Sequence, residues 1–564
     1  MSDERIKGIS RRQVLGGGVA AAIGSALSQP NAAEAVQARG QAGAAQQAQA
    51  EELVFVNGRI HTMDPKNTVV TTVTIRNGRF TAVGGAVPRA AAGRRIIDLR
   101  GRTVVPGIID NHNHIVAMGN RPGYHTPLEN ATSIADVQAI IAARAAAAPK
   151  GVWITTIGGF HRNQLVAPPE MARLPTLAEL DKAAPNNPVF LSEGFSGPSA
   201  TNSLGKKFFD SPIMPVPVGA DGSMAAGPQA SGRALLVLRQ TLLDAAERRR
   251  GAIDAMNYGL SLGVTTHLDQ GVFQKTDTPN DGAAHEDNYT MQLPFVALHR
   301  DGLLPARLRI NYLHQDATPE LTTLKERLRN TIPFFGDDMI KTGGIGEFIG
   351  GPKSFVDAAK LIARAGWRAE VHSLGQNDFQ QEIQDYETAN KESSIKDLRW
   401  VVAHVPFITE EWVNRLKAIG GGLSLTSWRY LAGTPQQNGP PFRMIVNNGI
   451  PAGMSSDGMQ IAPMNPWLHI YYAVTGKNAR GVLINDGQQI TREQVLKLYT
   501  ASNGWFLREE NQLGSIEAGK LGDLVVLNQD YFDNKAVPDE AIKKISAVMS
   551  VVGGKIVHDS GAVK

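Results

Sequence analysis

Residues 104–114 read VVPGIIDNHNH, an apolar run that Pro106-Gly107 interrupts and that ends in His112 and His114. An apolar run of this kind indicates a buried β-strand. Side chains at positions i and i+2 lie on the same face of a strand, so the two imidazoles point toward one place. Two convergent neutral imidazoles suit a divalent transition metal, with zinc the first choice. The stretch therefore predicts a strand that supplies two ligands of a metal site.

The composition limits which other ligands and partners are available. The chain has 564 residues, enough for a large domain and a smaller accessory one. Its net charge is only +4, and no long Lys/Arg run occurs, which argues against nucleic acid as a partner. It contains no cysteine, so disulfides and thiolate metal ligands are excluded. A metal must therefore be held by His, Asp, Glu or a modified Lys.

The N-terminal segment has the pattern of an export signal. Residues 10–15 read SRRQVL and resemble the twin-arginine signal, a weakly apolar stretch follows, and residues 33–35 read AEA, a small-x-small cleavage site. The apolar stretch is too short and too rich in glycine for a spanning helix, so no stable membrane insertion is expected. We predict a signal peptide over 1–35, a flexible linker over 36–50, and delivery by the twin-arginine export machinery to the periplasm or beyond.

Two kinds of pattern divide the rest of the chain. Residues 51–103 and 505–564 show short alternating strands with turn signals, and they predict one small β-sandwich built from both termini. Between them, residues 104–504 alternate strands with amphipathic helices, which is typical of a parallel sheet. Eight strands are predicted in this part: Val104–Ile109, Gly263–His267, Leu308–Leu313, Met339–Thr342, Ala369–His372, Trp400–His404, Gly422–Leu425 and Pro451–Ser455. The predicted fold is an α/β (β/α)₈ TIM-like barrel, with an inserted subdomain over 115–262 that holds two further strands.

Residues able to bind metal recur at the ends of the later strands. Lys341 lies in the fourth predicted strand, His372 and His404 end the fifth and sixth, and Asp457 follows the eighth. Barrel active sites lie at the carboxyl ends of the strands, so these side chains are expected to meet the His112 pair there. A lone histidine on a strand is more often a core residue, but the shared position of these residues favours ligands.

This order of residues resembles the amidohydrolase superfamily in its binuclear form. Three further motifs match: VPGIID at 105–110, GVTT at 263–266 and LGSIEAGKLGDL at 513–524. The layout is similar to the branch with a large insertion after the first strand, which includes N-substituted formamide deformylases. That branch usually carries an Asp-Gly-His run in the insertion, whereas residues 195–203 here read FSGPSATNS. The substrate of those relatives is therefore not transferred to this chain.

The resemblance implies two divalent ions, with zinc the first choice, and six ligands: His112, His114, Lys341, His372, His404 and Asp457. Lys341, carboxylated by carbon dioxide, would bridge the two ions, because a carbamate offers anionic oxygens and an ammonium does not. Two metals produce a hydroxide near neutral pH and polarise the carbonyl that it attacks. Asp457 would be the catalytic residue that takes the proton and passes it to the leaving nitrogen.

Five more residues are candidates for the substrate pocket, because they follow predicted strands or lie in the insertion: Phe160, His161, His267, Trp428 and Arg429. Arg429 would suit a substrate carboxylate.

The predicted function is that of an exported, metal-dependent amidohydrolase. It would cleave a C–N bond of a small-molecule amide, formamide, urea or cyclic amide. An ester or lactone hydrolase stays open, because the same hydroxide attacks either carbonyl. A metal-dependent decarboxylase or isomerase also stays open on such a barrel, as does a non-catalytic metal-binding protein. The sequence leaves both a monomer and a homo-oligomer open.

Overall fold

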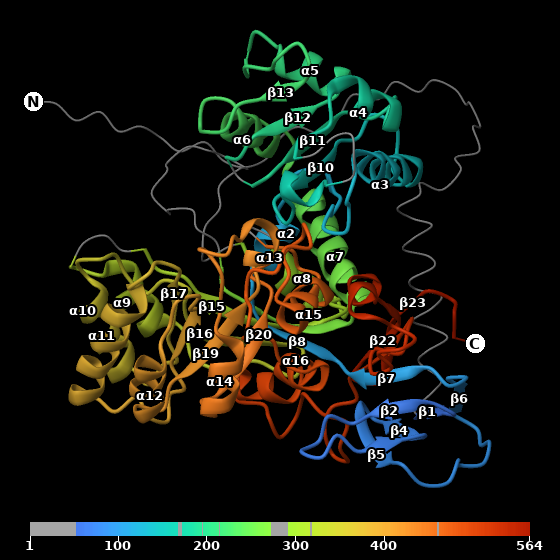
Figure 1. Cartoon of the computed structure of the whole chain (residues 1–564), viewed down its shortest axis with the longest axis vertical. Coiled ribbons are helices and arrows are strands. Elements are labelled where there is room, and N and C mark those ends of the chain that lie inside the picture. The colour runs from blue at the N-terminus through green and yellow to red at the C-terminus, as the bar shows by residue number, and fades with distance from the viewer. Residues whose placement is uncertain are drawn as a thin grey trace, which may run out of the picture. The chain divides into compact units, whose positions relative to one another are not determined.

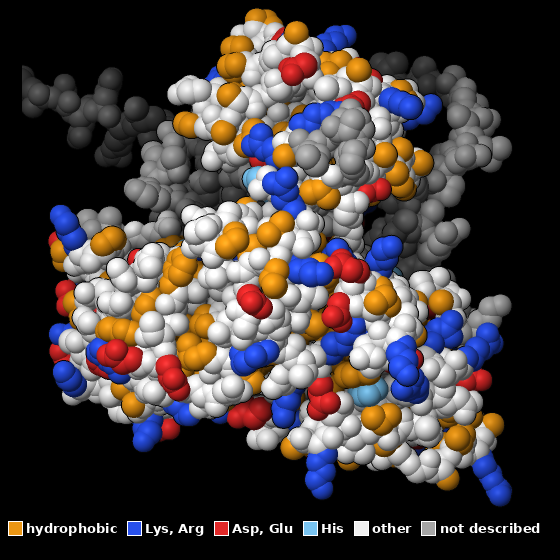
Figure 2. All heavy atoms as spheres, viewed as in Figure 1, with side chains coloured by type: hydrophobic (Ala, Val, Ile, Leu, Met, Phe, Trp, Pro, Cys, Tyr) orange, Lys and Arg blue, Asp and Glu red, His pale blue; other side chains and the backbone are white. Residues whose placement is uncertain are grey.

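The computed structural model describes residues 52–166, 172–194, 196–213, 215–271, 291–315, 319–458 and 462–563. The predicted signal peptide and linker, residues 1–50, lie outside these ranges. Within them, no helix combines the length and the apolar character that crossing a bilayer needs. On the face drawn in Figure 2, Lys and Arg side chains are interspersed with Asp and Glu side chains.

Eight parallel strands form two four-stranded sheets in the middle of the chain (Figure 1). The sheets have the orders β16-β15-β14-β8 and β17-β18-β19-β20. The strands are β8 (Ile108–Asn113), β14 (Val264–Asp269), β15 (Arg307–Tyr312), β16 (Ile340–Ile345), β17 (Glu370–Ser373), β18 (Val401–His404), β19 (Gly422–Thr426) and β20 (Ala452–Ser455). Ile345 bridges Ala369 in parallel between the two sheets. At the other edges, the backbone N of Asp457 donates to the carbonyl of His112 over 2.9 Å. We call these strands and their helices the parallel unit.

The first predicted strand divides in two at Gly107. Its first half belongs to β7 (Thr103–Pro106), which pairs with a C-terminal strand, and only its second half belongs to β8. A Cβ at Gly107 would lie 2.1 Å from Oγ1 of Thr265, so only glycine lets the backbone approach this side chain. The Pro-Gly interruption thus marks the boundary between two sheets rather than a kink within one strand.

Helices connect the parallel strands and cover them. They are α2 (Ile115–Gly119), α7 (Ala245–Leu262), α8 (Leu293–Arg300), α9 (Thr322–Asn330), α10 (Phe355–Arg364), α11 (Asp378–Glu392), α12 (Glu410–Ala418), α13 (Arg429–Ala432), α14 (Phe442–Asn448), α15 (Pro466–Thr475), α16 (Arg492–Tyr499), η3 (Ala501–Asn503) and α17 (Gly504–Leu507). The longest, α7, begins where the side chain of Asp244 accepts from the N of Glu247 and ends at left-handed Gly263. A large apolar core lies between these helices and the strands, with Trp367, Trp400 and Trp467 fully buried.

The segment between α2 and α7 forms its own sheet and core (Figure 1). Its strands, in the order β13-β12-β11-β10-β9, are β9 (Tyr124–His125), β10 (Ile154–Ile157), β11 (Val189–Ser192), β12 (Ser199–Thr201) and β13 (Ser223–Met224). Its helices are α3 (Ile134–Ala147), η1 (Arg162–Gln164), α4 (Leu177–Ala183), α5 (Ser203–Phe209) and α6 (Ser231–Leu242). Buried Glu129 fastens this segment to the parallel unit, because it accepts from the N of Asn465 over 3.0 Å.

Strands from both ends of the chain share the remaining two sheets. One sheet has the order β5-β4-β1-β6 and the other β23-β22-β21-β7-β2-β3. The strands are β1 (Glu52–Val56), β2 (Arg59–His61), β3 (Val69–Val70), β4 (Val73–Arg76), β5 (Arg79–Val83), β6 (Arg94–Asp98), β21 (Leu524–Leu527), β22 (Ala547–Val552) and β23 (Lys555–Asp559), with helix η4 (Asp539–Lys544) before β22. Val105 of β7 pairs with Val525 of β21, so the strand that precedes the His-x-His motif is held by the C-terminal part of the chain.

Candidate metal centre

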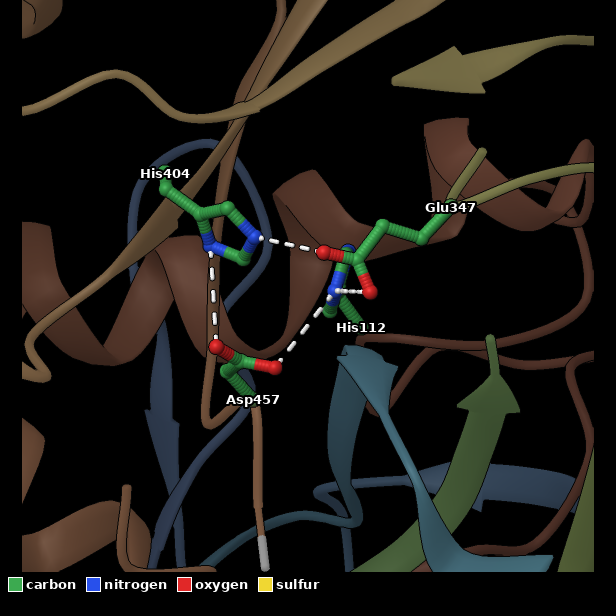
Figure 3. A group of neighbouring side chains, drawn as sticks. All are labelled: His112, Glu347, His404 and Asp457. Atoms are coloured by element: carbon green, nitrogen blue, oxygen red, sulfur yellow. Dashed lines mark hydrogen bonds and ion pairs between the residues drawn. The ribbon is translucent and has the colours of Figure 1, made fainter. Parts of the chain in front are cut away.

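Four buried side chains converge beyond the carboxyl ends of the parallel strands (Figure 3). His112 belongs to β8, His404 ends β18, Glu347 follows β16 and Asp457 follows β20. One ligand atom from each lies within 4.8 Å of the others. Residues far apart in the chain meet because parallel strands bring their carboxyl ends to one edge. The donor set of imidazole nitrogen and carboxylate oxygen is one that divalent transition metals prefer.

Glu347 lies between two pairs of histidines. Its Oε2 is 3.5 Å from Nε2 of His112 and 3.3 Å from Nε2 of His114. Its Oε1 is 3.1 Å from Nε2 of His404 and also contacts Nδ1 of His372. One carboxylate therefore faces all four imidazoles, with a different oxygen toward each pair. This is the arrangement that a ligand shared by two cations requires.

Asp457 approaches the same centre from β20. Its Oδ1 is 3.2 Å from Nε2 of His114 and 3.7 Å from Nε2 of His112, and its Oδ2 is 4.0 Å from Nδ1 of His404. Asp457 and His404 both have left-handed backbones, with φ of 54° and 71°. Such a conformation costs a non-glycine residue about 1–3 kcal/mol and is concentrated at functional sites. The fold thus accepts local strain to aim these two side chains.

Hydrogen bonds to the outer ring nitrogens orient the histidines. Nδ1 of His112 donates to Glu370 over 2.6 Å, and Nδ1 of His114 donates to the carbonyl of Gly271 over 2.8 Å. Each bond fixes the tautomer that leaves Nε2 as an acceptor facing the centre. Such outer partners hold a ligand in place before the cation arrives.

The two carboxylates make the centre attractive to positive charge. Although burial opposes ionisation, His372 and His112 hold the pKa of Glu347 well below its usual range. Although burial also opposes imidazolium, contacts with Asp457 and Glu347 raise the pKa of His114 to about 10. Within the described ranges, Nε2 of His112 and Oε2 of Glu347 are buried yet make no hydrogen bond of normal geometry. Opposed, unsatisfied atoms of these types fit a bound divalent cation.

The structure corrects the expected role of Lys341. Lys341 is the second residue of β16, at the amino end of the strand, and its ammonium pairs with Glu509. The predicted strand Met339–Thr342 ended three residues before the observed strand, which reaches Ile345. The carboxyl end was therefore placed too early, and Glu347, which lies just beyond it, was missed. The acidic residue after the run GGIG, residues 343–346, was the signal available in the sequence.

Of the four histidines at the centre, His372 is the one whose side chain is partly exposed to solvent. Its side chain is 22% exposed, whereas those of His112, His114 and His404 are fully buried. The ring of Phe348 stacks on it with the centroids 5.3 Å apart. The centre therefore opens toward solvent beside His372 and Phe348.

Two of the five pocket candidates lie elsewhere. Phe160 is buried in the apolar core of the segment between α2 and α7. His267 accepts from the side-chain amide of Asn113 over 2.9 Å. Asn113 lies between His112 and His114 in the chain, so its side chain points to the opposite face from theirs. The His267 ring packs toward Gly259 of α7, so it points away from the centre. Both candidates rested on chain position alone, and the structure places their side chains away from the metal centre.

The other three candidates lie along one contact between the insertion and the parallel unit. His161 caps η1 by accepting from the N of Asn163 over 3.1 Å, and η1 contacts α13. Trp428 and Arg429 follow β19, at the end of the parallel unit that carries the metal centre. The Arg429 guanidinium is buried and lies 3.9 Å from the centroid of the Trp428 ring.

Comparisons with known proteins agree with this geometry. A family model described as the amidohydrolase family matches residues 95–558. The N-substituted formamide deformylase of Arthrobacter pascens is 25% identical over 532 residues, which cover 86% of this chain and 95% of that protein. An uncharacterized metal-dependent hydrolase from Pyrococcus furiosus superposes with a TM-score of 0.55 at 19% identity, covering 86% of this chain and 100% of the other. A mutant of atrazine chlorohydrolase from Arthrobacter aurescens TC1, complexed with zinc and atraton, gives 0.53 at 15% identity, covering 90% and 95%.

The structural matches, all under 25% identity, establish likeness of fold. The family match extends from the strands before the His-x-His motif to the last strand of the chain and takes in every residue of the metal centre. The chain belongs to the amidohydrolase family.

Proposed function

We propose that the protein is a metal-dependent hydrolase that cleaves a C–N bond of a small-molecule amide, formamide, urea or cyclic amide. The observation that carries this proposal is Glu347, whose two oxygens face two pairs of histidines while Asp457 lies beside the first pair. The similarity to a formamide deformylase supports C–N cleavage. A protein that only stored metal would have no need of a second, strained carboxylate at the centre.

We also propose that the parallel unit closes as a (β/α)₈ barrel. The Ile345–Ala369 bridge joins β16 to β17, and the hydrogen bond from Asp457 to His112 joins β20 to β8. Closure explains why the site is built from the carboxyl ends of strands on both sheets.

Four imidazoles and two carboxylates would hold two divalent ions, with zinc the first choice: His112, His114, Glu347, His372, His404 and Asp457. The ions would supply an acidified water and a polarised carbonyl. Asp457 is suited to accept the proton and release it again, because His404 and His114 lower its pKa despite burial and so keep it ionised. It takes a proton from the attacking water and returns it to the nitrogen that leaves. With the ions bound, His112 and His114 would be neutral donors of electron pairs, fixed by their outer hydrogen bonds.

The export proposal stands on the sequence of residues 10–15 and 33–35. We propose that twin-arginine export delivers the protein to the periplasm or beyond. Replacing Arg11 and Arg12 together by Lys should strand the precursor in the cytoplasm of a host with this pathway. Unchanged delivery of that double variant would refute the proposal.

A paired substrate screen tests the hydrolase. Zinc-loaded protein is assayed on N-acyl, formamide, ureido and cyclic amide compounds, and on esters and lactones of matched shape. We expect turnover of at least one C–N class that disappears on chelation and returns with zinc. Turnover confined to esters and lactones would replace the proposal by the rival hydrolase.

A further inference from the structure

A group of cations lies at the amino ends of the parallel strands, away from the metal centre. Arg309 of β15, Lys341 of β16 and Arg368, just before β17, line one cavity. The apolar part of its wall includes Leu268 and Phe334. The cavity has a volume of about 10 Å³. That is roughly the space one particle the size of a water molecule needs.

Only two carboxylates form ion pairs with these three cations among the described residues, and each of the two also has a second partner. Glu509 accepts from Nε of Arg309 over 3.0 Å and also pairs with Lys341. Glu370 accepts from Nη2 of Arg368 over 2.6 Å, but its other oxygen accepts from His112. The cavity wall therefore has more positive than negative charge. The charge of Arg368 also acts on Arg508, whose pKa is lowered by burial and then by Arg399 and Arg368, against the opposing charges of Glu510 and Asp397.

The guanidinium of Arg368 is only partly satisfied. Arg368 is 1% exposed, and its Nε and Nη1 make no hydrogen bond to any residue in the described ranges. Leaving donors of a charged group unsatisfied in the interior is strongly unfavourable, because the group has lost its water without gaining a partner. Guanidinium and ammonium groups only donate, so the species that satisfies them best only accepts. Water must donate two hydrogen bonds of its own, whereas an inorganic anion accepts from every side.

We propose that Arg368, Arg309 and Lys341 bind one small monovalent inorganic anion of about the size of chloride. The anion accepts from Nε and Nη1 of Arg368 and offsets the excess positive charge. It also fixes the orientation of the guanidinium, whose Nη2 holds Glu370 against His112. The anion is thus a structural ligand, and Arg368 is a positioning residue for the metal centre. This site does not depend on which reaction the protein catalyses.

Crystallography with bromide tests the identity of the occupant. Crystals of the zinc-loaded protein are soaked in bromide, and anomalous scattering is measured at the bromine edge. We expect a single peak in the cavity within hydrogen-bond distance, about 3.5 Å, of Nε of Arg368. A cavity that holds only water at molar bromide would overturn the proposal.

Thermal unfolding tests binding in solution, because a ligand of the folded state makes the melting temperature depend on its concentration. Chloride is varied against gluconate at constant ionic strength. For a protein of this size we expect a rise of about 1 °C per tenfold chloride above the dissociation constant. Lys341→Met should lose this rise while still folding, since Arg309 keeps Glu509 paired.

Lys360→Met is the matched control. Lys360 also pairs with a carboxylate, that of Glu392, and its side chain is 23% exposed against 22% for Lys341. It should keep the chloride dependence of the parent protein. The same slope in Lys341→Met and the parent would place the effect elsewhere and overturn the proposal. A bromide peak without any chloride dependence would mean binding at crystal concentration only, and would also overturn it.

Discussion

The two ends of the parallel strands have opposite chemistry. The carboxyl end carries four histidines around Glu347 and Asp457, and it opens to solvent at His372. The amino end carries Arg309, Lys341 and Arg368 around shared carboxylates. The carboxyl-end residues meet one another across the strands, whereas at the amino end Arg309 and Lys341 meet Glu509 of the C-terminal segment and Arg368 meets Glu370. Which end of a strand a residue occupies therefore decides whether it binds metal, and residue type alone does not.

The largest expected effect separates Glu347 from Lys341. Glu347→Gln removes the charge that faces both pairs of histidines, so metal content and kcat/KM should fall together, activity by on the order of a thousandfold. Lys341→Met should lower activity by less than about tenfold, because Lys341 lies at the other end of the strand. Elemental analysis and steady-state kinetics measure both. The reverse ranking would return Lys341 to the metal centre.

Glu347 and Lys341 also show how much of the fold and of the metal centre the sequence can predict. Each of the eight predicted strands overlaps an observed one, because apolar runs and their turn signals determine where a strand lies. His112, His114, His404 and Asp457 could be placed together, since all lie at or beyond the ends of predicted strands. Glu347 was missed although it follows the run GGIG directly, because this run has few side chains to mark a strand and the observed strand continues through it to Ile345. The direction of the His267 side chain could not be predicted from the sequence either, because it depends on how β14 packs against α7.

The next largest effect concerns the proton. Asp457→Asn keeps the size of the side chain and one oxygen ligand but removes the base. We expect metal to be largely retained while kcat falls by about a hundredfold or more, with little change in substrate binding. Rapid-quench and equilibrium binding measurements separate the two quantities. A variant with nearly normal kcat would leave the proposed mechanism without its proton carrier.

A smaller effect should follow from Glu370, which connects the amino-end cations to the metal centre. Its carboxylate accepts from both Arg368 and His112, so Glu370→Gln weakens the hydrogen bond that orients the His112 ring but removes no metal ligand. Loss of such an outer partner typically costs about 10–100-fold in metal affinity. Competition with a chelator measures this, and Glu387→Gln, which breaks the surface pair with Arg415, is the control. Equal zinc affinities in the two variants would show that the ends act independently.

The smallest expected effect is the pH dependence of stability that His267 causes, a buried histidine that does not face the metal centre. Burial lowers the pKa of His267 to about 3. The unfolded chain, with a pKa near 6.5, takes up the proton first, so stability is lost as the pH falls below about 6.5. At pH 5 this amounts to about 2 kcal/mol relative to pH 8. Urea unfolding at both pH values measures the free energy of unfolding of the parent and of His267→Asn. Between pH 8 and pH 5, the variant should lose about 2 kcal/mol less of this free energy than the parent. Equal losses would mean that the pKa of His267 is not lowered in the folded protein, which would contradict its burial as a neutral ring.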